Sequence, residues 1–279
     1  AWNELKTDIN EPLQIDSSLT DLLLVDASKS YLKTLENHEY TAEVRIEGDQ
    51  ITAEAEFKKS LPFVFTLDSF DDELVFNSES VKAFGVVGYK KDAYKAIRIL
   101  YYRDDKNFTI KLIPQDSEHE IILHMTQSPF VTMADLVAEI DRRVDIGKTE
   151  SLKSGLEWKY YLDEEDEVVV PKINFNIEKN YAVLEGNSFA ASDRNYKIEE
   201  AFQRTAFILN EKGAEVETEA RVVALADSVA GVIELPKPKK MRFDKPFYLM
   251  LRRSDSSNPY FAMWLANTEL MVKNENSRE

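Results

Sequence analysis

The chain has 279 residues, of which 51 are acidic and 35 basic, so its formal net charge is −16. This charge repels phosphate backbones and anionic lipid head groups, and we therefore expect neither nucleic acid nor membranes as partners. The sequence contains no cysteine, which excludes disulfides and thiolate metal sites, and no apolar run is long enough to span a bilayer.

Two segments have the hydrophobic spacing of helices. Asp16–Asn37 begins with residues that can cap a helix and continues with leucines near helical spacing. In Ser128–Lys148, Thr132 and Asp135 resemble a capping box, and an apolar stripe precedes Gly147, a residue type that often ends helices. We expect one helix in each segment.

Most of the remaining sequence predicts β-strands. Turn residues separate the candidate strands, and neither an internal repeat nor a flexible linker is present. One domain over residues 1–279 is therefore expected, with a small helical part over 1–50 and a sheet core over 51–279, an α+β arrangement. The predicted strands are 40–46, 51–57, 96–102, 108–114, 120–125, 157–162, 167–175, 206–210 and 246–253.

Few residues suggest chemistry. The histidines are His38, His119 and His124, and the last two are five positions apart on one predicted strand, so they face opposite sides and are not expected to share a metal ion. The acidic run Asp163–Glu167 could hold a hard cation through its oxygens, but it is more typical of a solvated turn. Common nucleophile, phosphate-loop and zincin signatures are absent. We expect no enzyme activity, no metal and no cofactor.

The stretch from Asn210 to Ser228 has two different faces if it is extended. One face is small or branched throughout, whereas the other is charged over its first half. Such a strand could enter an existing sheet with its small face on a packed core. A surface helix remains an alternative, because Glu217 and Arg221 form a favourable helical pair. The small face consists of Ala214, Val216, Thr218, Ala220, Val222, Ala224 and Ala226.

Several blocks resemble the serpin family, in the family's order, from about Thr52 to the end of the chain. Ala201–Glu215 resembles the strand that leads into the reactive-loop hinge. Val168–Phe175 resembles an apolar strand with a Pro-Lys pair, and Met241–Arg253 and Pro259–Asn267 resemble the two late strands.

The resemblance implies a serpin-like α+β fold with large mixed or antiparallel sheets and a reduced set of helices. It also implies an extracellular, metastable inhibitor of a serine or cysteine protease, whose loop over about 211–240 is cleaved and then inserts as a strand. The first residue, Ala1, fits either an exported, processed product or a shortened chain. The implied hinge residues are Glu211, Gly213, Ala214, Val216, Thr218 and Ala220.

Family spacing places the scissile bond near Asp227–Ser228, which implies a target that cleaves after an acidic residue. The loop is longer than is usual in the family, so Leu225, Val229 and Ile233 stay open as alternatives.

Some positions depart from the family pattern. Most of the N-terminal helical third is missing, and Gln203 and Ala53 stand where the family has a histidine and an asparagine beneath its main sheet. These differences favour an alternative function, a non-inhibitory scaffold that binds a protein or a small ligand. The oligomeric state is left open.

Overall fold

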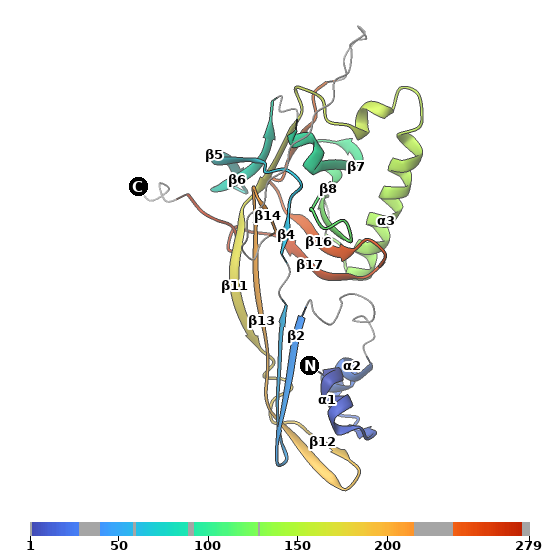
Figure 1. Ribbon diagram of the computed structural model, residues 1–279, viewed down its shortest axis with the longest axis vertical. Coiled ribbons are helices and arrows are strands. Elements are labelled where there is room, and N and C mark those ends of the chain that lie inside the picture. Colours follow the sequence, from blue (N-terminus) through green and yellow to red (C-terminus); the bar gives the residue numbers. More distant parts are fainter. Residues whose placement is uncertain are drawn as a thin grey trace. The chain divides into compact units, whose positions relative to one another are not determined.

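The computed structural model describes residues 2–27, 40–57, 60–88, 92–127, 129–214 and 237–274 (Figure 1). They form two compact units, each assembled from two parts of the chain. Unit 1 contains residues 1–59 and 175–206, and unit 2 contains residues 60–174 and 207–279. That the whole chain is one domain stays a prediction.

Unit 1 is built around the 17-residue strand β13, which begins in this unit and ends in unit 2. β13 pairs with β11, β12 and β3, β12 also pairs with β1, and β3 also pairs with β2. The β3–β13 pair is parallel, whereas the β2–β3 and β12–β13 pairs are antiparallel. The elements are α1 (Trp2–Ile9), β1 (Leu13–Gln14), α2 (Thr20–Ala27), β2 (Tyr40–Glu47), β3 (Gln50–Phe57), β11 (Ile173–Asn180), β12 (Ser188–Ala191) and β13 (Arg194–Asn210).

The two short helices of unit 1 bury one leucine each against its strands. Leu5 of α1 and Leu22 of α2 are fully buried in a cluster with Ile51, Phe189 and Ile198. This cluster is the hydrophobic core of the unit.

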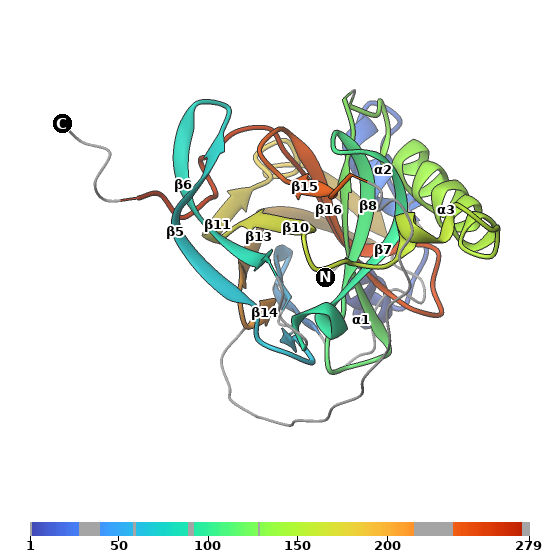
Figure 2. The same ribbon diagram turned by 90° about the horizontal axis from the view of Figure 1, so that it is seen from above.

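Unit 2 contains two sheets and most of the buried apolar residues. The first has the order β15-β10-β6-β5, and the second has the order β17-β16-β9-β8-β7 (Figure 2). Their strands are β5 (Asp68–Phe76), β6 (Glu79–Val87), β7 (Ile97–Asp104), β8 (Asn107–Leu112), β9 (His119–Met125), β10 (Glu167–Pro171), β15 (Lys240–Arg242), β16 (Phe247–Arg253) and β17 (Pro259–Leu265).

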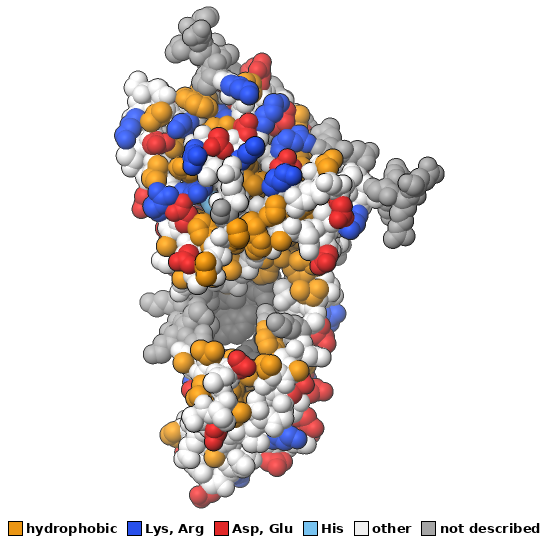
Figure 3. Space-filling model, turned by 180° about the vertical axis from the view of Figure 1, so that it is seen from behind, with side chains coloured by type: hydrophobic (Ala, Val, Ile, Leu, Met, Phe, Trp, Pro, Cys, Tyr) orange, Lys and Arg blue, Asp and Glu red, His pale blue; other side chains and the backbone are white. Residues whose placement is uncertain are grey.

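The surface of unit 2 mixes both signs of charge. Figure 3 shows Lys, Arg, Asp and Glu side chains interspersed over its upper part and hydrophobic side chains gathered along its lower part. Arg252, for example, lies 2.9 Å from Glu120 and 2.7 Å from Asp141. Among the described residues, no helix combines the length and the apolarity that a bilayer span requires.

The helix α3 (Met133–Glu150) confirms the second predicted helix. The side chain of Thr132 accepts a hydrogen bond from the Asp135 N–H, as the capping pattern predicted. α3 packs on a face of the five-stranded sheet (Figure 2), where Leu136 and Ile140 are buried with Ile122 of β9 and with Tyr248 and Met250 of β16. The helix continues past Gly147 to Glu150. Gly147 lies where α3 closely approaches the backbone of β7, since a Cβ there would be 1.9 Å from the Leu100 carbonyl oxygen.

Other predicted boundaries were wrong. The first helix begins at Thr20, because Asp16 accepts hydrogen bonds from the N–H and the hydroxyl of Ser18 and so forms a turn. Residues 28–37 of that predicted helix lie outside the described residues. The predicted strand 157–162 is instead a 3₁₀ helix over Glu157–Tyr160, where the Tyr160 hydroxyl donates to Glu150. The sequence patterns did not predict α1, β1, β5, β6 and β12, and the predicted strand 206–210 is only the last part of β13.

The α+β class with several mixed or antiparallel sheets is confirmed. The described residues contain three α-helices, and strands form most of the remaining regular structure.

Both described histidines are buried on β9. His119 Nδ1 lies 3.0 Å from the Tyr260 hydroxyl, and His124 Nδ1 lies 2.9 Å from the Thr109 hydroxyl. No cluster of metal-ligating side chains occurs among the described residues. Burial, reinforced by the charge of Arg143, lowers the pKa of His124 to about 3. His38 lies outside the described residues.

Acid should therefore destabilise the fold through His124. The unfolded chain binds a proton on this ring near pH 6.5, whereas the folded chain does not until about pH 3, so stability falls as the pH drops between these values. We expect the free energy of unfolding to fall by about 2 kcal/mol more between pH 7 and pH 5 in the native chain than in His124→Gln. Urea denaturation at each pH measures this difference, and equal pH profiles would contradict it.

Candidate functional site

The predicted hinge is a tight hairpin between β13 and the two-residue strand β14 (Gly213–Ala214). Asn210 pairs with Gly213 and Leu209 pairs with Ala214, both antiparallel. The Asn210 side chain accepts a hydrogen bond of 2.9 Å from the Lys212 N–H and so closes the turn. The chain therefore reverses direction at the residues that the serpin resemblance assigned to the hinge.

β14 is paired along both of its edges. Its second neighbour is β4 (Leu61–Pro62), in which Pro62 lies opposite Gly213 and Leu61 lies opposite Ala214. The Phe63 N–H donates to the Lys212 carbonyl at 2.8 Å, which extends this contact into the turn. β14 is thus an interior strand, although it contains only two residues.

Gly213 is required by this close packing. Its φ is +144°, and a Cβ would lie 2.5 Å from the Leu61 carbonyl oxygen and 2.6 Å from Pro62 Cα. Both neighbours are backbone atoms, which cannot move aside without breaking the sheet. Only glycine fits here without strain.

Ala214 begins the small face that the sequence analysis described. It is 1% exposed, and its partners Leu209 and Leu61 are fully buried. Residues directly opposite each other in a sheet point to the same side, so Ala214 lies on the core side of this sheet. The later members of the small face lie outside the described residues.

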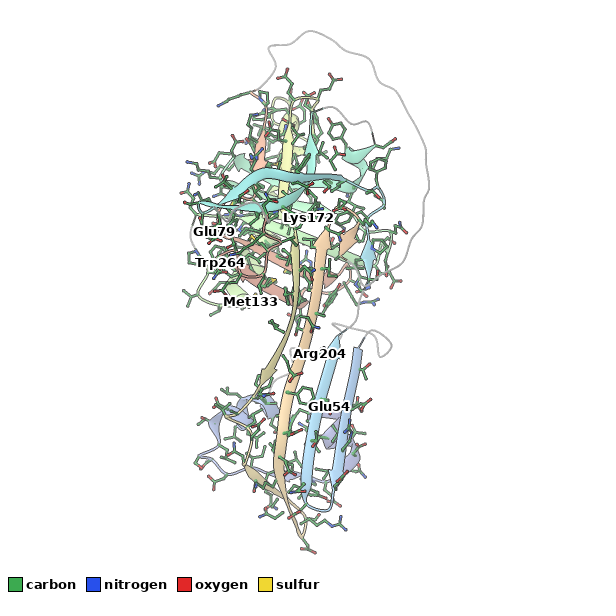
Figure 4. The ribbon with its side chains drawn as sticks, turned by 90° about the vertical axis from the view of Figure 1, so that its left-hand side faces the viewer. Glu54, Glu79, Met133, Lys172, Arg204 and Trp264 are labelled. Atoms are coloured by element: carbon green, nitrogen blue, oxygen red, sulfur yellow. The ribbon has the colours of Figure 1, made fainter. Side chains whose placement is uncertain are left out.

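An ion pair fastens the beginning of the loop. Lys172 Nζ lies 2.6 Å from Glu211 Oε2, and the two side chains are 14% and 24% exposed. Lys172, labelled in Figure 4, also donates to the Ser69 hydroxyl at 2.8 Å. Burial opposes the charged form of Glu211, but the contact with Lys172, a hydrogen bond from its own N–H and the charge of Lys212 together hold the pKa of this carboxyl below its ordinary value.

A second ion pair fastens the end of the loop. Lys239 Nζ lies 2.7 Å from Asp166 Oδ2, and both side chains are almost fully buried. The Lys239 N–H donates to Asp166 Oδ1 at 2.6 Å, and its ammonium donates to the Trp158 carbonyl and lies over the rings of Trp158 and Tyr161. Asp166 belongs to the acidic run, which forms a turn as predicted: the Asp166 N–H donates to the Asp163 carbonyl.

Gln203 and Ala53, the two positions that depart from the family pattern, lie on the parallel β3–β13 pair in unit 1. We call it the seam, and it consists of Gln50–Glu56 paired with Lys197–Arg204. Glu54 and Arg204 lie on these neighbouring strands in Figure 4. Ala53 lies opposite Ala201, and Gln203 lies opposite Ala55, so the two positions that depart from the family pattern are not partners across the seam.

The strand pairings of the hairpin and of the seam can be compared by residue number. Leu209 and Leu61 lie opposite the same residue of β14, and Arg204 pairs directly with Glu56 in the seam. The two residues of each pair differ by 148 in residue number. The residues of β13 that face β14 thus share one register with Glu200–Arg204 of the seam, and the register shifts by one residue only beyond Glu200, between Ile198 and Glu200.

The structure brings together three of the six predicted hinge residues, Glu211, Gly213 and Ala214. Val216, Thr218 and Ala220, and the scissile candidates Leu225, Asp227, Ser228, Val229 and Ile233, lie outside the described residues. The sequence reading noted Lys172 in a Pro-Lys pair but gave it no partner, and it did not single out Lys239. No local pattern marks such long-range ion pairs.

Comparison with solved structures finds serpins. The fold is similar to Serpin48 of the insect Tenebrio molitor, with 12% sequence identity, a TM-score of 0.41, and coverage of 78% of this chain and 56% of that one. It is also similar to Serpin-12 of Manduca sexta, with 12% identity, a TM-score of 0.44, and coverage of 80% and 57%. Uncleaved ovalbumin matches with 14% identity, a TM-score of 0.43, and coverage of 78% and 54%.

This chain therefore spans little more than half the length of the structures that it matches. No family model matches its sequence, and no curated protein does.

The Lys172–Glu211 pair should stabilise unit 2 at neutral pH. Lys172→Met leaves a half-buried carboxylate without its counter-charge, and we expect the free energy of unfolding to fall by about 1–3 kcal/mol. Because the folded pKa of Glu211 is lowered, this loss should shrink as the pH falls through that pKa. Lys148→Met is the control, since Lys148 and its partner Asp145 are 72% and 75% exposed. Equal losses in urea denaturation would contradict a special role for the hinge pair.

Gly213→Val should detach β14 from β4 without unfolding unit 2. Hydrogen exchange at the Phe63 N–H, which donates to Lys212, should become at least about tenfold faster, because the added atoms displace the Leu61 and Pro62 backbone. Gly155→Val is the control for backbone strain alone. Gly155 also has a positive φ, of +86°, but no atom lies within 4 Å of its Cβ position. Unchanged protection of Phe63 would show that the close packing is not needed.

Proposed function

We propose that the chain inhibits a serine or cysteine protease by a serpin-like mechanism, in which its loop is cleaved and then inserts as a strand. The observation that carries this proposal is the interior position of β14, in register with the seam. The loop already begins as a strand between β13 and β4, so insertion would continue an existing ladder.

Extension of β14 would open the seam residue by residue. In the present register, Glu219 would come to lie opposite both Arg204 and Glu56, which now pair with each other. The entering strand runs antiparallel to β13, as Gly213 and Ala214 do. One parallel ladder would thus be replaced by two antiparallel ladders, which are the more stable kind per residue. The small face that starts with buried Ala214 would enter the core side.

The uncut loop is held at both ends, and this supports a requirement for cleavage. Glu211 is paired with Lys172, and Lys239 is paired with buried Asp166 and precedes β15. Full insertion draws the loop along the sheet, which the tether at Lys239 opposes until the backbone is cut. The uncut form would then be metastable, because a kinetic barrier separates it from the more stable inserted form.

The target protease would supply all the covalent chemistry. Its serine hydroxyl or cysteine thiol attacks the carbonyl of the scissile bond, the amine leaves on the C-terminal part, and an ester or thioester joins the N-terminal part to the protease. Insertion of that part would then carry the enzyme away from its working geometry. We propose the bond near Asp227–Ser228, with Leu225 as a second site, and an extracellular location.

A second function is supported by the seam itself. Its segments of eight and seven residues form a ladder with a single irregularity, between Ile198 and Glu200. The residues opposite Ala201 and Gln203 in this ladder are both alanines. A seam that stays closed would make the chain a non-inhibitory scaffold that binds a protein or a small ligand.

Cleavage of the loop by a non-target protease distinguishes these functions. If insertion follows, we expect the melting temperature to rise by more than about 10 °C, which corresponds to several kcal/mol for a chain of this size. Val216→Arg should remove this rise while leaving the loop cleavable, because a buried unpaired charge opposes insertion. Glu217→Arg is the matched control, since its side chain falls on the charged face. An unchanged melting temperature after cleavage of the native chain would support the scaffold.

A further inference from the structure

Unit 1 contains an apolar cavity beside the seam. Its volume is about 270 Å³, and residues from α1, α2, β3, β13 and the turn after β11 line it. A dry cavity of about 150 Å³ is enough to hold benzene, so this one has room for a molecule of one or two rings. Its lining residues are Trp2, Leu5, Val25, Ile51, Ala53, Tyr181, Leu184, Ile198, Ala201 and Phe202.

The chemistry of the lining selects an uncharged ligand. None of the lining side chains carries a charge, and the indole N–H of Trp2 is already committed to Asp26 at 3.0 Å. A charged molecule would lose its hydration in this cavity without gaining a counter-charge from the lining. Val25 is 37% exposed and therefore marks the solvent side.

The cavity touches both strands of the seam at directly paired positions. Ile51 of β3 pairs with Ile198 of β13, and Ala53 pairs with Ala201. All four residues line the cavity. A strand placed between β3 and β13 would separate the members of each pair by about 4.8 Å more, one strand spacing. The shape of the cavity therefore depends on whether the seam is closed.

We propose that this cavity binds a small, uncharged, largely apolar molecule, and that the bound molecule opposes opening of the seam. The second part rests on the proposed function, in which strand insertion opens the seam. A ligand that contacts both strands binds the closed form better, and by linkage it stabilises that form by the same factor.

Binding is tested with 6-propionyl-2-dimethylaminonaphthalene, an uncharged probe with two fused rings whose fluorescence rises in apolar sites. The full chain should bind it saturably at one site per chain, and the melting temperature should rise with probe concentration. Ala201→Leu should weaken binding at least about tenfold, because its side chain fills the cavity. Val25→Arg should do the same by placing a charge at the solvent side, where the fold tolerates it.

Val183→Arg is the matched control and should bind as the native chain does. Val183 lies between two lining residues, Tyr181 and Leu184, but is itself 62% exposed and does not line the cavity. Absent binding, or equal binding in all four proteins, would overturn the proposed site.

The link to the seam is tested by repeating the titration after loop cleavage. If the cleaved chain melts higher and binds the probe at least about tenfold more weakly, the link is supported. If it melts higher and binds equally well, the link is wrong and the site stands. If neither the melting temperature nor the affinity changes, the proposed function and the link are both wrong. The existence of the binding site is then judged only from the affinities of the three variants.

Discussion

Backbone pairing of β14 along both edges is the constraint on which the proposed insertion of the loop depends. A two-residue strand has little stability of its own, yet Gly213 and Ala214 are held between β13 and β4. The absence of a side chain at Gly213 allows backbone approaches that any Cβ would prevent. The direction and register of the loop are therefore fixed at its first residues.

Electrostatics act at the ends of the same loop. The Lys172–Glu211 pair is partly exposed, whereas the Lys239–Asp166 pair is buried and is supported by a backbone carbonyl and two aromatic rings. Removal of one partner from a buried pair costs far more than removal from an exposed pair. The end of the loop is thus the firmer anchor, which fits the proposed mechanism, in which the residues between Ala214 and the cut move and the end stays.

Local patterns predicted the elements whose periodicity agrees with their packing. The capping pair and apolar stripe located α3, and apolar runs located strands such as β10 and β16. Acidic residues in Asp68–Phe76 concealed β5, and Glu157–Tyr160 alternates like a strand although contacts with α3 hold it as a 3₁₀ helix. Resemblance located Glu211 and Gly213, but their partners Lys172 and Pro62 depend on tertiary pairing, which sequence spacing does not encode.

The most direct test of the central claim is the structure of the loop-cleaved chain. We predict that the residues after Ala214 form a strand between β13 and β3, with Glu219 opposite Arg204 and Glu56 and with the β13–β14 register unchanged. A cleaved chain in which Lys197–Arg204 still pairs directly with Gln50–Glu56 would contradict it.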